Sequence, residues 1–137
     1  MEVLSTRSAL LLLREAFYGT TRFDDFAERV GISEPVAATR LKELVDHGLL
    51  ERASYREPGQ RTRQGYRLTE KGADLFPTLV ALKQWGDRWL APRGAPVELA
   101  HRNCGAPVRA ELRCSAGHHT EPRDLDLEIG PGGRRRH

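Results

Sequence analysis

The chain has 137 residues, of which 39% are apolar, so it has room for one domain with a modest core and a small appendage. Its net charge of +3 is accounted for by residues 134–136, all arginines, so the global charge gives no argument for a nucleic-acid partner. Two cysteines without a secretory signal exclude a disulfide framework, and the apolar run 10–13 is too short to cross a membrane. We therefore expect a cytoplasmic protein without a membrane partner.

The first predicted element is a helix over roughly residues 6–17, apolar around most of its circumference. A helix of this kind is normally covered by two neighbours. One neighbour should be the pair of helices that follows, and the other should come from another element or a second subunit. Gly19 is expected to end this helix, and Thr20 or Thr21 to cap the next one.

Residues 23–46 have the pattern of two short amphipathic helices joined by a tight turn at residues 31–33, which is typical of a helix-turn-helix. Gly31 suits the left-handed conformation just beyond a helix, and Ser33 suits the start of the next. Three apolar residues of the second helix share one face and should point at the core: Ala37, Leu41 and Leu44.

The opposite face of this second helix is the candidate surface for reading DNA. Side chains near the start of such a helix can meet base edges in a major groove. The candidates on or beside this face are Ser33, Pro35, Val36, Thr39, Arg40 and Lys42. Taken alone, the stretch is better explained as an ordinary helical hairpin of a small bundle, because such pairs are common.

The residues that follow favour DNA binding. Residues 49–55 and 66–69 are predicted strands around a turn-rich segment, so the order is helix, turn, helix and β hairpin, as in a winged helix. The predicted fold class is mainly α with a small β hairpin, a winged helix-turn-helix with a small C-terminal β/loop appendage. Arginines on the projecting loop are expected to reach phosphates or a narrow minor groove: Arg56, Arg61 and Arg63.

After the hairpin, a helix is predicted over about residues 69–90, with Thr69 as its cap and Pro77 causing a kink or a late start. A winged-helix core is nearly complete without this helix, so the apolar stripe of the helix is a surplus apolar surface. We therefore favour a subunit interface over packing within its own domain. The interface candidates are Leu75, Leu79, Leu82, Trp85 and Trp89. The predicted DNA-binding domain with this helix covers residues 1–91.

Seven motifs follow each other in order, at residues 10–19, 22–26, 31–33, 40–44, 48–52, 66–72 and 84–89. On these residues the chain resembles the HxlR-type family of bacterial winged helix-turn-helix transcriptional regulators, relatives of the MarR type, over roughly residues 4–90. The resemblance implies a homodimer on a palindromic operator, contacted by the second helix and the hairpin. It also implies that Arg40 faces DNA and that residues 75–89 join the dimer contact.

The chain departs from the family at its beginning. Family members usually have a further N-terminal helix, often with a cysteine that senses oxidants or electrophiles. This sequence starts where that helix would end, so the helix is expected to be missing or to precede the internal methionine at which the sequence begins. Thiol sensing is therefore not carried over.

Residues 92–137 form a predicted linker, a segment with cysteine and histidine pairs, and a disordered basic tail over residues 130–136. Two such pairs flank a strand-like stretch at residues 108–113, as in a degenerate zinc ribbon. The candidate zinc ligands are His101, Cys104, Cys114 and His118. The alternative, reduced surface thiols and scattered histidines, is favoured because such loose motifs often match by chance.

No enzyme motif is present: there is no glycine-rich phosphate loop, nucleophile elbow or metalloprotease His-Glu pair. We expect no catalytic residues and no cofactor other than the zinc considered above. The predicted function is sequence-specific regulation of transcription by a homodimer bound to double-stranded DNA. One alternative is a winged-helix module whose hairpin arginines bind an acidic protein. Another is a regulator that binds a small molecule between its first helix and the dimer helix, for which the sequence names no ligand.

Overall fold

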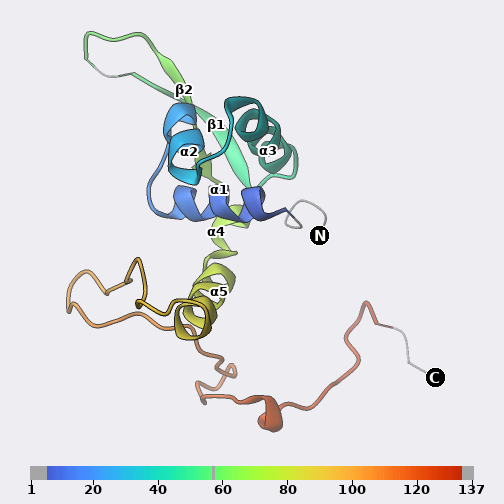
Figure 1. Cartoon of the computed structure of the whole chain (residues 1–137). Helices are drawn as coiled ribbons and strands as arrows, with labels where there is room; N and C mark the ends of the chain where they lie inside the picture. Colours follow the sequence, from blue (N-terminus) through green and yellow to red (C-terminus); the bar gives the residue numbers. More distant parts are fainter. Residues whose placement is uncertain (1–5, 57, 134–137) are drawn as a thin grey trace. The chain divides into compact units, whose positions relative to one another are not determined.

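A computed structural model describes residues 6–56 and 58–133 of the chain (Figure 1). Its elements are α1 (Arg7–Phe17), α2 (Phe23–Val30), α3 (Glu34–Asp46), β1 (Leu50–Tyr55), β2 (Arg63–Leu68), α4 (Glu70–Ala73), α5 (Phe76–Trp89) and the 3-10 helix η2 (Pro122–Asp124). The chain divides into two compact units, which we call the winged unit, ending at Val80, and the C-terminal unit, beginning at Ala81. The mainly helical winged-helix fold predicted from the sequence is confirmed.

The division lies inside α5, whereas the sequence placed the domain boundary near residue 91. Leu79 packs against the apolar core of the winged unit, and Val80 is buried. Further along the helix, Gln84 binds the backbone of Ala110 in the C-terminal unit. The first turns of α5 therefore belong to one unit and the remaining turns to the other.

The helix ends of the winged unit follow the sequence signals closely. Thr6 caps α1, accepting a hydrogen bond from the backbone N–H of Ala9 at 3.2 Å. Gly31 ends α2 with φ = 74°, a left-handed conformation that glycine adopts without strain. Ser33 caps α3 through the N–H of Val36, at 3.4 Å. These caps fix the turn between the two helices.

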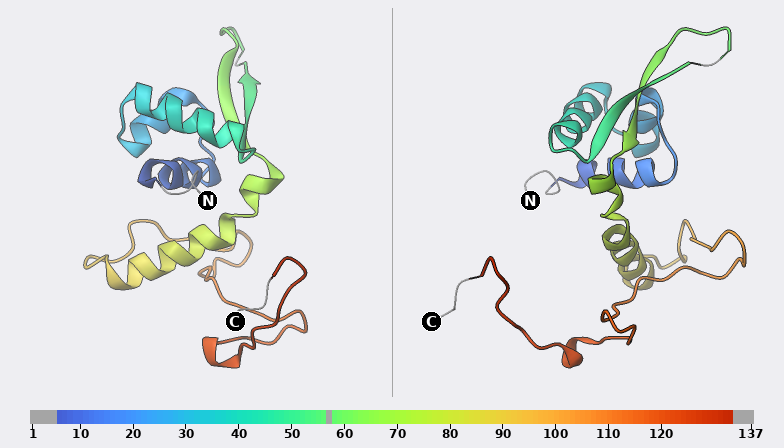
Figure 2. Two further views of the ribbon diagram at one scale, coloured as in Figure 1. Left: turned by 90° about the vertical axis from the view of Figure 1, so that its right-hand side faces the viewer. Right: turned by 180° about the vertical axis from the view of Figure 1, so that it is seen from behind.

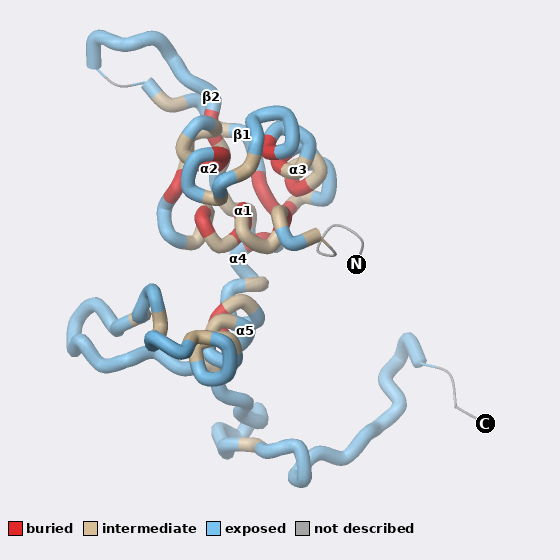
Figure 3. Tube along the Cα trace, in the orientation of Figure 1, coloured by how far each residue is buried: buried red, intermediate tan, exposed pale blue. Residues whose placement is uncertain are grey.

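The core of the winged unit lies between α1, α2, α3 and β1. Its largest fully buried side chains are Phe26, Leu12, Leu13, Leu41, Leu44 and Leu50. The expected inward face of α3 is confirmed, because Ala37, Leu41 and Leu44 are fully buried. Buried positions gather in this unit, as the red segments in Figure 3 show. Apolar burial of this kind is the main force that stabilises a small domain.

One polar cluster is also buried, and it corrects a sequence expectation. Thr20 does not cap α2, which begins after Arg22 without a side-chain cap. Instead its hydroxyl donates to the carboxylate of Glu15 at 3.3 Å and accepts from the guanidinium of Arg29 at 2.7 Å. Buried polar groups need such partners. Thr20 therefore connects α1 to α2.

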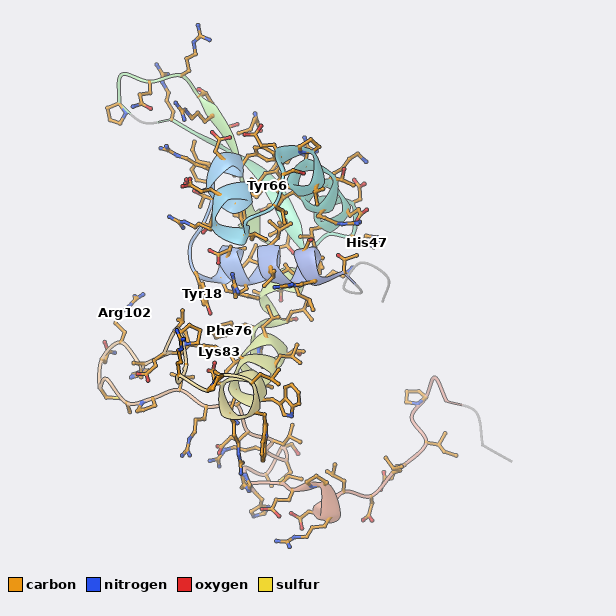
Figure 4. All side chains as sticks on the ribbon, in the orientation of Figure 1. Tyr18, His47, Tyr66, Phe76, Lys83 and Arg102 are labelled. Atoms are coloured by element: carbon orange, nitrogen blue, oxygen red, sulfur yellow. The ribbon has the colours of Figure 1, made fainter. Side chains whose placement is uncertain are left out.

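The hairpin is joined to the helices at its base. β1 and β2 are antiparallel, with a register that runs from Leu50 opposite Leu68 to Tyr55 opposite Arg63. The N–H of Tyr66 donates to the carbonyl of Thr21 at 2.7 Å, and the Tyr66 ring meets Phe26 edge to face. Tyr66 accordingly lies where the hairpin joins the helices (Figure 4). Since β2 begins at Arg63, the hairpin is longer than predicted.

The helix predicted over residues 69–90 is divided into α4 and α5, and Pro77 lies in the first turn of α5, which is a late start. The cap expected at Thr69 is confirmed, since its hydroxyl accepts from the N–H of Gly72 at 3.1 Å. The same hydroxyl donates to the carbonyl of Gly48, and the Lys71 ammonium donates to the carbonyl of His47 at 2.8 Å. These two hydrogen bonds link the C-terminal end of α3 to the start of α4.

The C-terminal unit has little regular structure beyond α5 (Figure 2). The predicted strand over residues 108–113 is wrong: none of these residues lies in a strand, and among them only Arg113 forms an isolated bridge, with His119. Ala110 instead bonds to the side chain of Gln84. Of the predicted tail, residues 134–136 lie outside the described part. No helix of the described residues is long and apolar enough to cross a membrane.

Candidate nucleic-acid interface

The first half of α3 presents an open surface. Its exposed residues, with the cap before it, are Ser33, Glu34, Pro35, Val36, Ala38 and Thr39. The hydroxyl of Thr39 donates to the carbonyl of Pro35 at 3.0 Å, which leaves its oxygen lone pairs available. Apart from Glu34, this surface consists of small or apolar side chains. Its small and apolar side chains, other than Glu34, could therefore lie close to a base edge.

The charged candidates on α3 are already engaged with carboxylates of the same helix. One guanidinium nitrogen of Arg40 lies 3.0 and 3.1 Å from the two carboxylate oxygens of Glu43. The ammonium nitrogen of Lys42 lies 2.9 Å from a carboxylate oxygen of Asp46. This hydrogen bond is the main reason that the pKa of Asp46 lies below its usual value. Arg40 is half-buried on the flank of the helix. It can therefore meet a base only through its remaining nitrogens or by leaving Glu43.

The hairpin separates its charges along its length. Near its base, Arg67 pairs with Glu51 on the adjacent strand, so that positive charge is offset. Towards the tip, Arg56, Arg61 and Arg63 are exposed and have no carboxylate partner within the described residues. The loop that carries them projects away from α1, α2 and α3 (Figure 1). Uncompensated positive charge on a projecting loop is suited to phosphate.

The sequence analysis did not identify two features of this surface. The first is the neutralising carboxylates, Glu43 beside Arg40 and Asp46 beside Lys42; their spacings of three and four residues on a helix were a readable signal. The second is Arg52, exposed on β1, whose charge also lowers the pKa of Asp46. Arg52 is not among the contact candidates predicted from the sequence.

The residues predicted for a subunit interface fall into two groups. Leu75 and Leu79 are partly buried against the core of the winged unit. Leu82, Trp85 and Trp89 are 52%, 58% and 62% exposed, and follow each other at three and four residues along α5. Only the second group forms a mostly exposed apolar stripe, in which the Arg88 guanidinium lies 4.7 Å from the centre of the Trp89 ring.

The four zinc candidates are brought together only in part. Cys114 and His118 lie at one turn, with sulfur and Nδ1 3.4 Å apart. His101 and Cys104 lie at another turn, where the N–H of Gly105 donates to the carbonyl of His101 at 2.7 Å. Within residues 6–56 and 58–133 no three metal-binding side chains gather at one place. The four-ligand site therefore stays a prediction.

Helix, turn, helix and a basic hairpin packed on one core define the winged-helix class of DNA-binding domains. Residues 3–94 match the family described as HxlR-like helix-turn-helix, and the chain belongs to that family.

Known relatives carry related names. An uncharacterized HTH-type transcriptional regulator of Mycobacterium tuberculosis, Rv3095, is 42% identical over 134 residues, covering 96% of this chain and 84% of the relative. A similar structure is that of PA1607, a proposed transcription factor, with a TM-score of 0.81, 35% identity and coverage of 93% and 89% of the two chains. The transcriptional regulator YodB of Bacillus subtilis in its reduced form matches with a TM-score of 0.55, 30% identity and coverage of 66% and 88%. The chain is a transcriptional regulator with a helix-turn-helix domain.

Proposed function

We propose that this regulator binds a two-fold symmetric operator as a homodimer, placing α3 in the major groove and the hairpin tip on the phosphate backbone. The observation that carries the proposal is the combination of an exposed first half of α3 with three exposed arginines on the adjoining hairpin that have no carboxylate partner among the described residues. Helix-turn-helix dimers read two half-sites whose symmetry mirrors their own.

Within this proposal the two surfaces have different roles. Pro35, Val36 and Thr39 present short side chains to base edges, with Arg40 at the flank. Arg61 and Arg63 neutralise phosphates and carry no base information. Base preference should therefore depend on α3, and overall affinity and its salt dependence on the hairpin.

The test is a salt titration of binding to operator and scrambled DNA. Arg40→Ala should cost about 1–3 kcal/mol on the operator and relax base preference, if Arg40 makes a two-point base contact. Arg61→Ala or Arg63→Ala should weaken binding to both DNAs alike and lower the salt slope by about one unit for each lost phosphate contact. The operator can be sought first in DNA next to the protein's own gene.

A matched variant sharpens the test of Arg40. Glu43→Gln removes the carboxylate that holds the guanidinium while leaving Arg40 in place. It should strengthen operator binding, because Arg40 is released and a negative charge near DNA is removed. If the hairpin variants change base preference while Arg40→Ala shifts only overall affinity, the assigned roles are reversed. If no variant matters, the surface does not bind DNA, and the protein-binding alternative takes its place.

The dimer contact is assigned to the exposed stripe of Leu82, Trp85 and Trp89. Large exposed apolar patches mark interaction surfaces, and two linked half-sites raise affinity by mass action. Leu82→Glu combined with Trp89→Glu should yield a monomer by light scattering and should weaken operator binding. Ala73→Glu adds a charge at an exposed position of α4 and should leave the dimer intact. An unchanged dimer mass in the double variant would refute this assignment.

A further inference from the structure

A turn in the C-terminal unit brings the side chains of Cys114 and His118 together. The sulfur of Cys114 lies 3.4 Å from Nδ1 of His118, and both residues are exposed. Two soft or borderline donor atoms, a thiol sulfur and an imidazole nitrogen, thus face the same small volume. Neither has a role in the DNA-binding surface.

The separation of these two atoms matches that of two ligands on one metal ion. Zinc lies about 2.3 Å from a thiolate sulfur and about 2.0–2.1 Å from an imidazole nitrogen. At a tetrahedral angle these bonds place sulfur and nitrogen roughly 3.5 Å apart. The separation of the two atoms is therefore the one that a shared zinc ion requires.

The backbone of the turn also donates a hydrogen bond to the sulfur. The backbone N–H of His118 donates to the sulfur of Cys114 at 3.3 Å. The N–H of Cys114 donates to the carbonyl of His118 at 3.0 Å, and Gly117 closes the turn with φ = 88°. Since the thiolate is the form that binds metal, a hydrogen bond to the sulfur favours the metal-bound state.

Two donors are not enough, because zinc in proteins normally has four ligands or three with water. The other cysteine and histidine pair, Cys104 and His101, does not supply them within the same chain, since no third metal-binding side chain of the described residues lies near. Between the two turns, Ala110 is held by Gln84 through two hydrogen bonds of 2.8 and 3.4 Å. These bonds hold the backbone of the segment that separates the two turns.

We propose that Cys114 and His118 form half of a zinc-class metal site, completed by the same pair from a second copy of the chain. Two exposed turns meeting about a two-fold axis bring two sulfurs and two nitrogens together, which is a full tetrahedral set. Metal binding releases the thiol protons to solvent. The proposal concerns the C-terminal unit alone and does not depend on DNA binding.

The experiment is elemental analysis of the full chain, equilibrated with zinc and freed of excess by gel filtration. The expected content is about half an equivalent per chain, because one ion joins two chains. Cys114→Ser and His118→Ala should reduce the content to background. His118→Cys keeps a zinc ligand at that position and should retain the metal.

The matched controls are Cys104→Ser and His101→Ala, which make the same chemical changes at the other turn and should leave the zinc content unchanged. Replacement of zinc by Co²⁺, whose visible spectrum reports sulfur ligands and tetrahedral geometry, gives a second readout for each variant. One equivalent per chain, lost equally from Cys104→Ser and Cys114→Ser, would show a four-ligand site within one chain and overturn the proposal. Binding of no zinc, or of zinc that no variant affects, would overturn it as well.

Discussion

The winged unit is built around a closed apolar core, whereas the C-terminal unit is held by individual polar contacts. Side chains such as Phe26, Leu41 and Leu44 are fully shielded from water in the first. None of the described residues from 81 to 133 is buried in the second (Figure 3). Apolar burial is cooperative and non-directional, while a single exposed hydrogen bond contributes only about 0.5–1.5 kcal/mol. The two units should therefore respond very differently to similar substitutions.

The largest difference is expected between two leucines. Leu41→Ala leaves a cavity beneath α3 and should lower the free energy of unfolding by about 2–5 kcal/mol. Leu127→Ala removes a side chain that is 100% exposed and should change it by less than about 0.5 kcal/mol. Chemical denaturation followed by circular dichroism measures both. Equal effects would contradict the contrast between the two units.

Two glycines provide the next comparison. A methyl group at Gly72 would overlap the carbonyl oxygen of Leu49, so Gly72→Ala should destabilise the winged unit by about 2–3 kcal/mol. A methyl group at Gly86 meets nothing within 4 Å in its own chain, so in the monomeric Leu82→Glu, Trp89→Glu variant Gly86→Ala should stabilise α5 by roughly 0.5–1 kcal/mol. Thermal unfolding of the two variants should shift the midpoint in opposite directions.

The smallest change in stability is expected when the hydrogen bonds between Gln84 and Ala110 are removed. Gln84→Ala removes both hydrogen bonds to Ala110 and should cost about 0.5–1.5 kcal/mol, confined to the C-terminal unit. Amide hydrogen exchange should accelerate at Ala110 and stay unchanged at buried Leu44. Gln84→Glu keeps an acceptor for the Ala110 N–H and should slow exchange again. Faster exchange at Leu44 would show that the connection supports the core as well.

Features that depend on neighbouring residues could be predicted from the sequence, whereas contacts between distant residues could not. Ser33, Gly31 and the inward face of α3 follow from local rules of capping and periodicity, and the structure has them as expected. Thr20 was misjudged because its partners, Glu15 and Arg29, come from two different helices. The Gln84 contact has no periodic signal at all, and the strand expected at residues 108–113 had no partner strand to pair with.

For the candidate DNA-binding surface too, the sequence predicted which side chains are exposed but not which side chains contact each other. Periodicity placed Pro35, Val36 and Thr39 on the exposed side of α3, which is where the structure has them. It did not reveal that Arg40 is held by Glu43, because the prediction considered which face a residue occupies and not its neighbours on that face. In the same way, the α5 stripe was treated as one surface, although Leu75 and Leu79 pack on the core of their own unit.

The hairpin register has a consequence for proteolysis. Pairing ends at Tyr55 and Arg63, so Arg56 and Arg61 stand in exposed chain between two paired strands. Exposed loop tips are preferred sites of proteolytic nicking, and trypsin cuts after arginine. Within the winged unit, a brief digestion should therefore cut first at this tip, while the paired strands and the core hold the two fragments together. A DNA duplex lying across the tip would shield the peptide bonds that follow these arginines. The cleavage rate after Arg61 would then report the fraction of protein bound to DNA.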